Sequence, residues 1–538
     1  MKKIGAIVFG IVGLASSLLL YANLPSLRFE YPEIPISTFP TGDRLTVRAE
    51  LDLGGFDFGR YPIAADDCVT GIRIDGTPIY SAECEPGLTG RVRAFSVPGS
   101  FSAGTHSLEI EVENHEAFGC LGLPTRAGVA VRWLLLWAAM AWFLFRAEGS
   151  RGVRAFAVVA LGFAFAYSVL TPFCVRANDF WGHSAYIQYV AQNWRLPGVT
   201  EFWCSFHPPV YYAISAFFGR LGIRPVDLAF AAYAGTLVLF WRRYRDWLGF
   251  AMLAFFPVHL FCVSRVSNDV VMPLLGLFYL LAMDRLVREP RNWRAVLGTS
   301  AVMLVAVATK LSALSFVPGL LFVAIRRRRE LGIGRFVALF LPFGLFLLAW
   351  MFRSWSESGD LFYMAIPGLG EQMRVPNGWG HFFGFSPTSF FGESVADNWA
   401  GSLRHHVLEF FLTSSLQGEF RYPSSLALPL FVARGILLVF FGFTLVRVFR
   451  KRAGEFWTNP AVLLLASQTA FYLFTNVSHP FSPFQDARYW AATFPAIAWL
   501  IGHVHENFGA NRPFRFAYSA LGALFLGVIG FFYLGILT

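Results

Sequence analysis

Long apolar runs, interrupted by short basic segments, fill most of the chain. Runs of roughly 17 to 25 apolar residues are long enough to cross a bilayer as helices. With arginine clusters as boundaries, the pattern predicts thirteen spans and therefore a polytopic α-helical membrane protein. These are expected near residues 4–24, 128–145, 153–174, 226–241, 247–263, 270–287, 294–309, 311–325, 335–352, 424–446, 460–476, 489–503 and 516–537.

Residues 25–126 follow a different pattern, with short alternating runs separated by Gly, Pro and Asp. Examples are LTVRAELDL, GIRIDGTPIY and HSLEIEVEN. This pattern predicts an extracytoplasmic all-β sandwich. The stretches AADDCVTGIRIDGTPI and GTHSLEIEVEN resemble the galactose-binding-like jelly rolls attached to many carbohydrate enzymes, which implies a jelly-roll-like form. The resemblance implies sugar binding, whereas a structural lid and a plain β-hairpin both stay open, because fold alone does not give function.

The domain organisation follows from these two patterns. A transmembrane anchor (1–24), with a cleaved signal peptide as the alternative, precedes the β-sandwich (25–126). The rest divides into a transmembrane helix with a cytoplasmic connection (127–152), a membrane core (153–352) with an external loop (174–208), an extracytoplasmic loop region (353–423) and C-terminal transmembrane helices (424–538). The short helix PPVYYAISAFF is expected to lie on the membrane or dip into it, because counting it as a span would put Arg242–Arg245 outside.

Composition and charge support this class. The chain is 55% hydrophobic and only 14% charged, with a mean hydropathy of +0.51. Its net charge of +10 comes mostly from arginine clusters that fall on one side of the predicted spans. Short cytoplasmic loops retain Lys and Arg, so the N-terminus is predicted inside. The charge is therefore a topology signal and does not indicate nucleic-acid binding.

Polar residues gather at the predicted external ends of the spans. The midplanes are nearly free of charged residues, which argues against an ion-coupled transporter. The external groups are Asp179 with His183, His207, Arg265 with Asn268-Asp269, Lys310, and Asp486 with Arg488. The sequence therefore predicts a site at the outer membrane surface.

Lys310 is one of four lysines in the chain, and it alone is predicted at the outer surface. Such a cation either snorkels towards lipid phosphates or binds an anion in a site. The same two interpretations apply to Arg488. Two cations converging at one membrane depth would suit a phosphate carried on a lipid tail.

Asp179 and His183 are four residues apart, so a helix would place them on one face. Asp179 is either a general base or the N-cap of that helix, and Asp269 is either a second acid or a cap. His183 and His207 could ligate a divalent metal together with Asp179, or could be packing residues. Aromatic residues such as Trp181 and Tyr186 form an interfacial belt or a sugar-stacking platform.

Six cysteines are present, without a CxxC metal pattern. Cys174 and Cys204 bracket the Asp179 loop. An oxidising exterior would allow them to pair, so a bridge between them is a hypothesis.

Five segments together resemble the GT-C membrane glycosyltransferases, which include protein O-mannosyltransferase-like and aminoarabinose-transferase-like enzymes that use polyprenyl-phosphate sugars. The segments are NDFWGHSAYIQYVAQNWRLP, FHPPVYYAISAFF, SRVSNDVVMPLLGLFYLLA, ATKLSAL and DARYWAATFPAI. The resemblance covers about residues 153–325 in order, with a looser match near 485–500. It implies a GT-C-like membrane core, with Asp179 as general base, Asp269 as a second external acid, and Lys310 and Arg488 on the donor phosphate.

The resemblance completes the set of candidate site residues. They are Asp179, His183 and Asp269 for catalysis; Lys310, Arg488 and Arg265 for the donor phosphate; and His207, Tyr211, Tyr186 and Trp181 for the substrate. Related enzymes often have paired acids in the first external loop. Here Asn178 precedes Asp179, which makes a requirement for a divalent metal doubtful.

The expected activity is inverting transfer of a hexosyl or pentosyl group from a polyprenyl-phosphate donor. No other cofactor is expected, and the acceptor would be an envelope glycan, lipid or protein outside the membrane. Two alternatives stay open. One is a non-catalytic polysaccharide export or assembly protein with a glycan-binding β domain, and the other is a ligase that transfers a whole lipid-linked oligosaccharide.

Overall fold

The structure is a computed structural model. The residues that it describes are 2–23, 26–29, 44–53, 61–65, 68–81, 92–95, 101–102, 104–113, 121–122, 126–170, 179–363, 375, 378–392, 406–418, 424–450, 456–478, 481, 485–507 and 512–537.

Helices make up most of the described chain, as the apolar runs predict. The first group is α1 (Lys2–Asn23), α2 (Arg126–Ala141), α3 (Arg151–Leu170), α4 (Phe180–Asn193), α5 (Val210–Arg220), α6 (Pro225–Tyr244), α7 (Trp247–Phe255), α8 (Pro257–Phe261) and α9 (Met272–Arg288). The second is α10 (Trp293–Thr309), α11 (Phe316–Arg326), α12 (Arg328–Ser358), α14 (Trp379–Phe383), α15 (Pro387–Gly392), α16 (Val407–Gln417), α17 (Ala427–Arg450), α18 (Pro460–Ser478), α19 (Phe494–Asn507) and α20 (Arg512–Leu537).

Short helical turns join several of these helices. A π-helical turn, η1 (Trp142–Arg146), extends α2. The 3₁₀ turns are η2 (Cys262–Ser264), η3 (Asn268–Val271), η4 (Leu311–Ser315), η5 (Ser424–Leu426), η6 (Phe456–Thr458) and η8 (Ala487–Thr493). Four of them, η3, η4, η5 and η8, directly precede α9, α11, α17 and α19.

Within the described residues, seven helices are long and apolar enough to cross a membrane, or up to nine if two bent pairs each count as one span. The chain is thus a mostly helical protein of polytopic membrane type. The count of thirteen stays a prediction, because helices such as α10 and α19 have 17 and 14 residues, fewer than the roughly 20 that a bilayer crossing takes. Helix α5 meets α6 at 114°, which fits the expectation that α5 is not a separate span.

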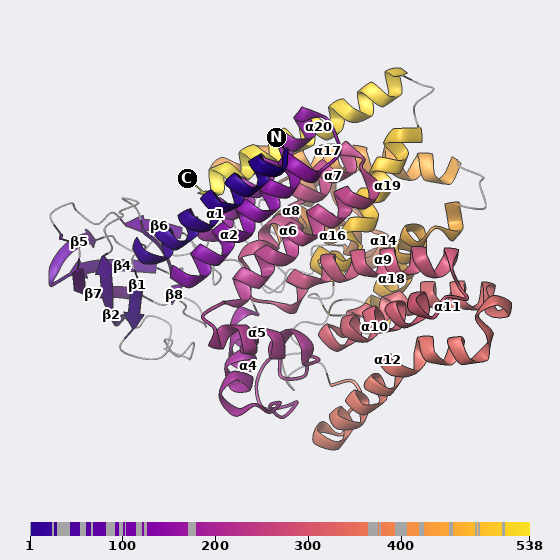
Figure 1. The fold of residues 1–538 in the computed structure, drawn as a ribbon, viewed down its shortest axis with the longest axis horizontal. Coiled ribbons are helices and arrows are strands. Elements are labelled where there is room, and N and C mark those ends of the chain that lie inside the picture. Colours follow the sequence, from indigo (N-terminus) through magenta and orange to yellow (C-terminus); the bar gives the residue numbers. More distant parts are fainter. Residues whose placement is uncertain are drawn as a thin grey trace.

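The strands lie between residues 26 and 122 and form two antiparallel sheets. One has the order β1-β2-β7-β4-β5 and the other β6-β3-β8. Their bounds are β1 (Ser26–Phe29), β2 (Arg44–Leu53), β3 (Tyr61–Ala65), β4 (Cys68–Ile74), β5 (Thr77–Ser81), β6 (Val92–Phe95), β7 (Gly104–Glu113) and β8 (Leu121–Gly122). Figure 1 shows the strands at one end of the molecule, beside α1 and α2. A jelly-roll form and sugar binding stay predictions.

The DG dipeptide of the predicted hairpin forms the turn between β4 and β5. Asp75 and Gly76 have φ values of 49° and 76°, and Ile74 pairs with Thr77 across the turn. Two successive residues with positive φ are typical of a type I′ hairpin turn, whose twist matches that of the strands.

Close packing of α9 against η8 brings two distant segments together at one end of the helices. Gly276 lies in α9 where a Cβ would overlap the backbone carbonyl of Ala492 in η8. Only glycine therefore permits this approach. The contact holds η8, which carries Arg488, beside the start of α9, which follows Asp269.

Replacing Gly276 with alanine is expected to destabilise the protein by about 1 to 3 kcal/mol, because a backbone carbonyl cannot move aside as a flexible side chain can. Thermal unfolding of the purified protein in detergent measures this effect. Gly298→Ala in α10 is the matched control, because no described atom lies within 4 Å of its Cβ position. It should be neutral or slightly stabilising, since alanine favours a helix. Equal stability of the two variants would contradict the tight α9–η8 contact.

Candidate functional site

Asp179 precedes α4, but its side chain accepts no capping hydrogen bond from the described backbone of that helix. Its Oδ1 instead accepts a hydrogen bond from Trp203 Nε1 at 3.3 Å, and its Oδ2 lies 3.0 Å from Arg488 Nη1. The alternative that Asp179 acts as a side-chain cap is therefore wrong. Its carboxylate faces another segment of the chain, as a reactive or ion-binding group would.

Arg488 is held between two carboxylates. The Arg488 backbone N–H donates to Asp486 Oδ1 at 2.8 Å, so Asp486 caps η8. The Arg488 Nε lies 3.7 Å from Asp486 Oδ2. The Arg488 side chain is only 7% exposed. The local sequence QDAR thus builds a short capped turn that aims the guanidinium towards Asp179.

Lys310 lies between α10 and η4, where an extended backbone (φ −153°, ψ 129°) ends the helix. Its ammonium group forms an ion pair with Asp269 Oδ1, and the Lys310 side chain is 8% exposed. Lys310 does not snorkel in this structure, so that interpretation is wrong. A buried ammonium needs a counter-charge, and Asp269 supplies it.

Asp269 is held in turn by its own segment. Ser267 Oγ donates to Asp269 Oδ2 at 3.2 Å, and Ser267 also caps η3. The residue that precedes α9 is Val271, so Asp269 is not the cap of that helix. Asn268 Nδ2 donates to the Thr309 carbonyl at 3.2 Å, which ties η3 to the end of α10 beside Lys310.

The two ion pairs meet at Tyr489. Lys310 Nζ lies 4.7 Å and Arg488 Cζ lies 5.6 Å from the centroid of the Tyr489 ring. Both cations therefore lie beside one aromatic ring, although their segments are far apart in sequence. Tyr489 directly follows Arg488, but one tyrosine among many aromatic residues carries no signal of a site in the sequence.

This cluster lies at one end of α9. Asp269 precedes the helix, whereas Arg285 and Arg288 are in its last turn. A helix rises 1.5 Å per residue, so its 17 residues separate the two ends by about 25 Å. The ion pairs are thus at the opposite end from these arginines.

His183 is buried behind Asp179. Its Nδ1 is 2.7 Å from the Tyr212 hydroxyl, and its ring lies parallel to that of His207 with centroids 5.5 Å apart. Burial lowers the pKa of His183 to about 4, despite the opposing effects of Asp179 and Asp269. Burial also lowers the pKa of His207, and the nearby His183 adds to this. Both imidazoles are therefore neutral near pH 7.

Residues 194–209, which we call the connecting loop, join α4 to α5 and carry Trp203, Cys204 and His207. The loop is held by hydrogen bonds: Val199 N–H donates to Glu357 in α12 at 2.7 Å, and Ser205 Oγ donates to the Val199 carbonyl at 2.9 Å. Gly182 in α4 leaves the space that the loop fills, because a Cβ there would lie 2.9 Å from Cys204 Sγ.

One half of the predicted Cys174–Cys204 bridge, Cys174, lies outside the described residues, so the bridge stays a prediction. Among the described residues Cys204 has no disulfide partner; its thiol is buried, and burial raises its pKa. Among the described residues, the candidate ligand atoms of His183, Cys204 and His207 lie within 4.8 Å of one another. Cys204 thus stands where the sequence predicts Asp179 as the third ligand.

The remaining predicted residues lie around this centre. Tyr186 is fully buried and stacks on Tyr212 at 3.8 Å, and Tyr211 packs edge-on against His183 at 6.5 Å. Arg265 is buried, with its guanidinium 4.5 Å from the Phe261 ring centroid. The side chain of Trp181 lies outside what the structure describes. Roles of these residues in binding substrate or phosphate stay predictions.

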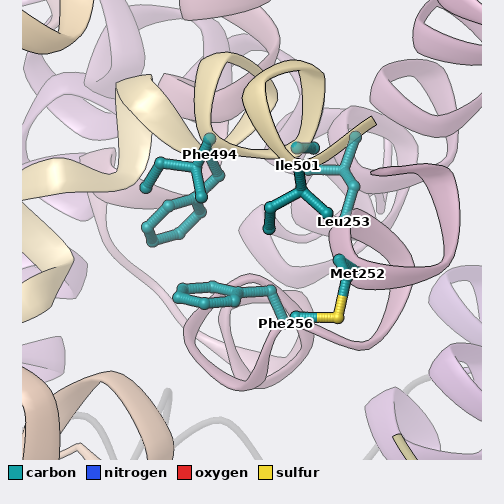
Figure 2. Close-up of a pocket in the computed structure, with 7 residues that line it drawn as sticks. Met252, Leu253, Phe256, Phe494 and Ile501 are labelled. Atoms are coloured by element: carbon teal, nitrogen blue, oxygen red, sulfur yellow. The ribbon is translucent and has the colours of Figure 1, made fainter. Parts of the chain in front are cut away.

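A small pocket between α7 and α19 is lined by none of the ion-paired residues. Figure 2 shows Phe256 and Phe494 on one side of it, with Met252, Leu253 and Ile501 on the other. Its described lining is entirely apolar, so it offers no group for acid–base or phosphate chemistry.

No family model and no curated protein sequence matches this chain. Among solved structures, the arabinosyltransferase EmbB from Mycobacterium smegmatis matches over 94% of this chain and 53% of its own, at 13% identity and a TM-score of 0.36. The chain thus spans about half the length of EmbB. A likeness this distant assigns neither a family nor an activity.

Proposed function

We propose that this protein is an integral membrane glycosyltransferase of the GT-C type. It would transfer a sugar from a polyprenyl-phosphate donor to an acceptor hydroxyl on the extracytoplasmic face of a bacterial cytoplasmic membrane. The observation that carries the proposal is the pair of ion pairs, Asp179–Arg488 and Asp269–Lys310, whose cations converge on Tyr489.

The two cations suit a phosphate leaving group. A departing phosphate is a stable anion, so it needs positive charge nearby more than a strong general acid. Lys310 and Arg488 are both at least nine-tenths buried, where a charge interaction is stronger than in water. Each cation is paired with a carboxylate. A donor phosphate would replace Asp179 as the partner of Arg488 and would bind Lys310 beside Asp269.

That exchange would also free Asp179 to act as a base. The acceptor oxygen would attack the anomeric carbon as the bond from that carbon to the phosphate oxygen breaks, and Asp179 would take the hydroxyl proton. A single displacement of this kind inverts the anomeric configuration. Asp269 would stay beside Lys310 and hold it in place.

His183 would act as a positioning residue in this mechanism. With a pKa of about 4 it is neutral at neutral pH, so it cannot compete with Lys310 and Arg488 for the phosphate as a third cation. Its hydrogen bond with Tyr212 fixes its ring behind Asp179. It would thereby position the start of α4.

A lipid-linked donor accounts for the position of the site. The ion pairs are at the opposite end of α9 from Arg285 and Arg288, the end that the basic residues predict to be extracytoplasmic. A donor with a polyprenyl tail would stay in the bilayer while its phosphate reached these cations.

Lipid mass spectrometry of membranes tests the proposed activity. Cells that lack the protein should accumulate a glycosylated polyprenyl phosphate, and wild-type protein should relieve the accumulation. The mass of the lipid would identify the sugar and distinguish a single-sugar donor from an oligosaccharide. Unchanged polyprenyl-phosphate lipids in the deletion strain would contradict the proposal and favour an export or assembly role.

A further inference from the structure

Two histidines and a cysteine meet where α4 packs on the connecting loop. The candidate ligand atoms of His183, Cys204 and His207 all lie within 4.8 Å of one another. Around a tetrahedral Zn²⁺, with bonds of about 2.0–2.3 Å, neighbouring ligand atoms are roughly 3.3–3.6 Å apart. Side-chain shifts of about 1 Å would therefore close this group around an ion. We propose that His183, Cys204 and His207 form a zinc site.

The donor set favours zinc over the hard cations. One thiolate and two imidazoles are ligands that Zn²⁺ commonly takes, whereas Mg²⁺ and Ca²⁺ prefer oxygen. Asp179, the carboxylate nearest in sequence, is engaged by Trp203 and Arg488 instead. The site is therefore distinct from the two ion pairs.

The ligands are already oriented by their neighbours. In the tautomer in which His183 Nδ1–H donates to the Tyr212 hydroxyl, 2.7 Å away, Nε2 would be the coordinating nitrogen, in the manner of outer-shell partners at known zinc sites. The two imidazole planes differ by only 15°. Cys204 has a φ of 72°, a conformation that non-glycine residues rarely adopt and that is enriched at functional sites.

Coordination would fix the loop that holds Asp179. His183 belongs to α4, whereas Cys204 and His207 belong to the connecting loop, so one ion would join the two segments. Trp203, next to Cys204, donates the hydrogen bond to Asp179. The inference does not depend on the proposed sugar transfer, because it concerns only the binding of a metal.

Metal analysis of the purified full-length protein, freed of any polyhistidine tag, is the first test. We expect about one Zn²⁺ per chain after dialysis, and loss of most of it in Cys204→Ser. Cys262→Ser is the matched control, because Cys262 is the other buried free cysteine among the described residues. It should keep the zinc of the wild type. Equal zinc in the two variants would overturn the proposal.

Cobalt substitution provides a second test that does not depend on any variant folding. Wild-type protein loaded with Co²⁺ should show thiolate-to-cobalt charge-transfer absorption and the strong visible bands of a tetrahedral site. Absence of both from correctly folded, Co²⁺-treated wild-type protein would overturn the assignment. Neither readout involves a sugar donor, so failure here is distinguishable from failure of the proposed glycosyl transfer.

Discussion

Asp179→Asn is expected to slow sugar transfer by about 100- to 10,000-fold, the usual contribution of a positioned general base. Asparagine has nearly the same shape and still offers an oxygen to Trp203, but it cannot accept the acceptor proton. It also removes the counter-charge of Arg488, so donor binding should be unchanged or tighter. Turnover and donor affinity, measured separately on purified protein with a synthetic polyprenyl-phosphate sugar, check both parts.

The control is the same substitution, aspartate to asparagine, at the opposite end of α9 from the ion pairs. Asp284 pairs with Arg243 and Arg288, away from the cluster, and Asp284→Asn should leave turnover unchanged. Wild-type turnover in Asp179→Asn would show that Asp179 only holds Arg488. A thermal unfolding curve for each variant separates lost chemistry from lost structure.

Lys310→Met should weaken donor binding and also destabilise the protein. Losing a charged hydrogen-bond partner of the phosphate corresponds to about 1.5 to 3 kcal/mol, or about a tenfold to hundredfold rise in the donor Kd. The variant would also leave Asp269 buried without its counter-charge, which costs about 3 to 5 kcal/mol. Donor titration and thermal unfolding measure the two effects independently.

A double variant distinguishes the two roles of Lys310. Lys310→Met combined with Asp269→Asn removes both charges, so stability should recover towards the wild-type value. Donor binding should stay weak, because the cation for the phosphate is still missing. If the double variant binds donor as tightly as wild type, Lys310 serves only as the partner of Asp269.

The hydrophobic pattern predicted the local elements well. Each predicted apolar span coincides with described helical segments, and the DG turn lies in the predicted hairpin. These features depend on residues close together in the chain, through 3.6- and 2-residue periodicity and turn chemistry. Lys310 and Arg488 were found in the same way, because a cation stands out in an apolar segment.

The partners of these residues were decided only by the tertiary structure. That Asp179 faces Arg488 rather than capping its helix, and that Lys310 pairs with Asp269 rather than reaching towards lipid, depends on how α4, α9, α10 and η8 pack. The same holds for Cys204, which lies beside His183 and His207. Such contacts join segments far apart in the chain. Their geometry is set by steric fit at positions such as Gly276 and Gly182, which carry no periodic signal in the sequence.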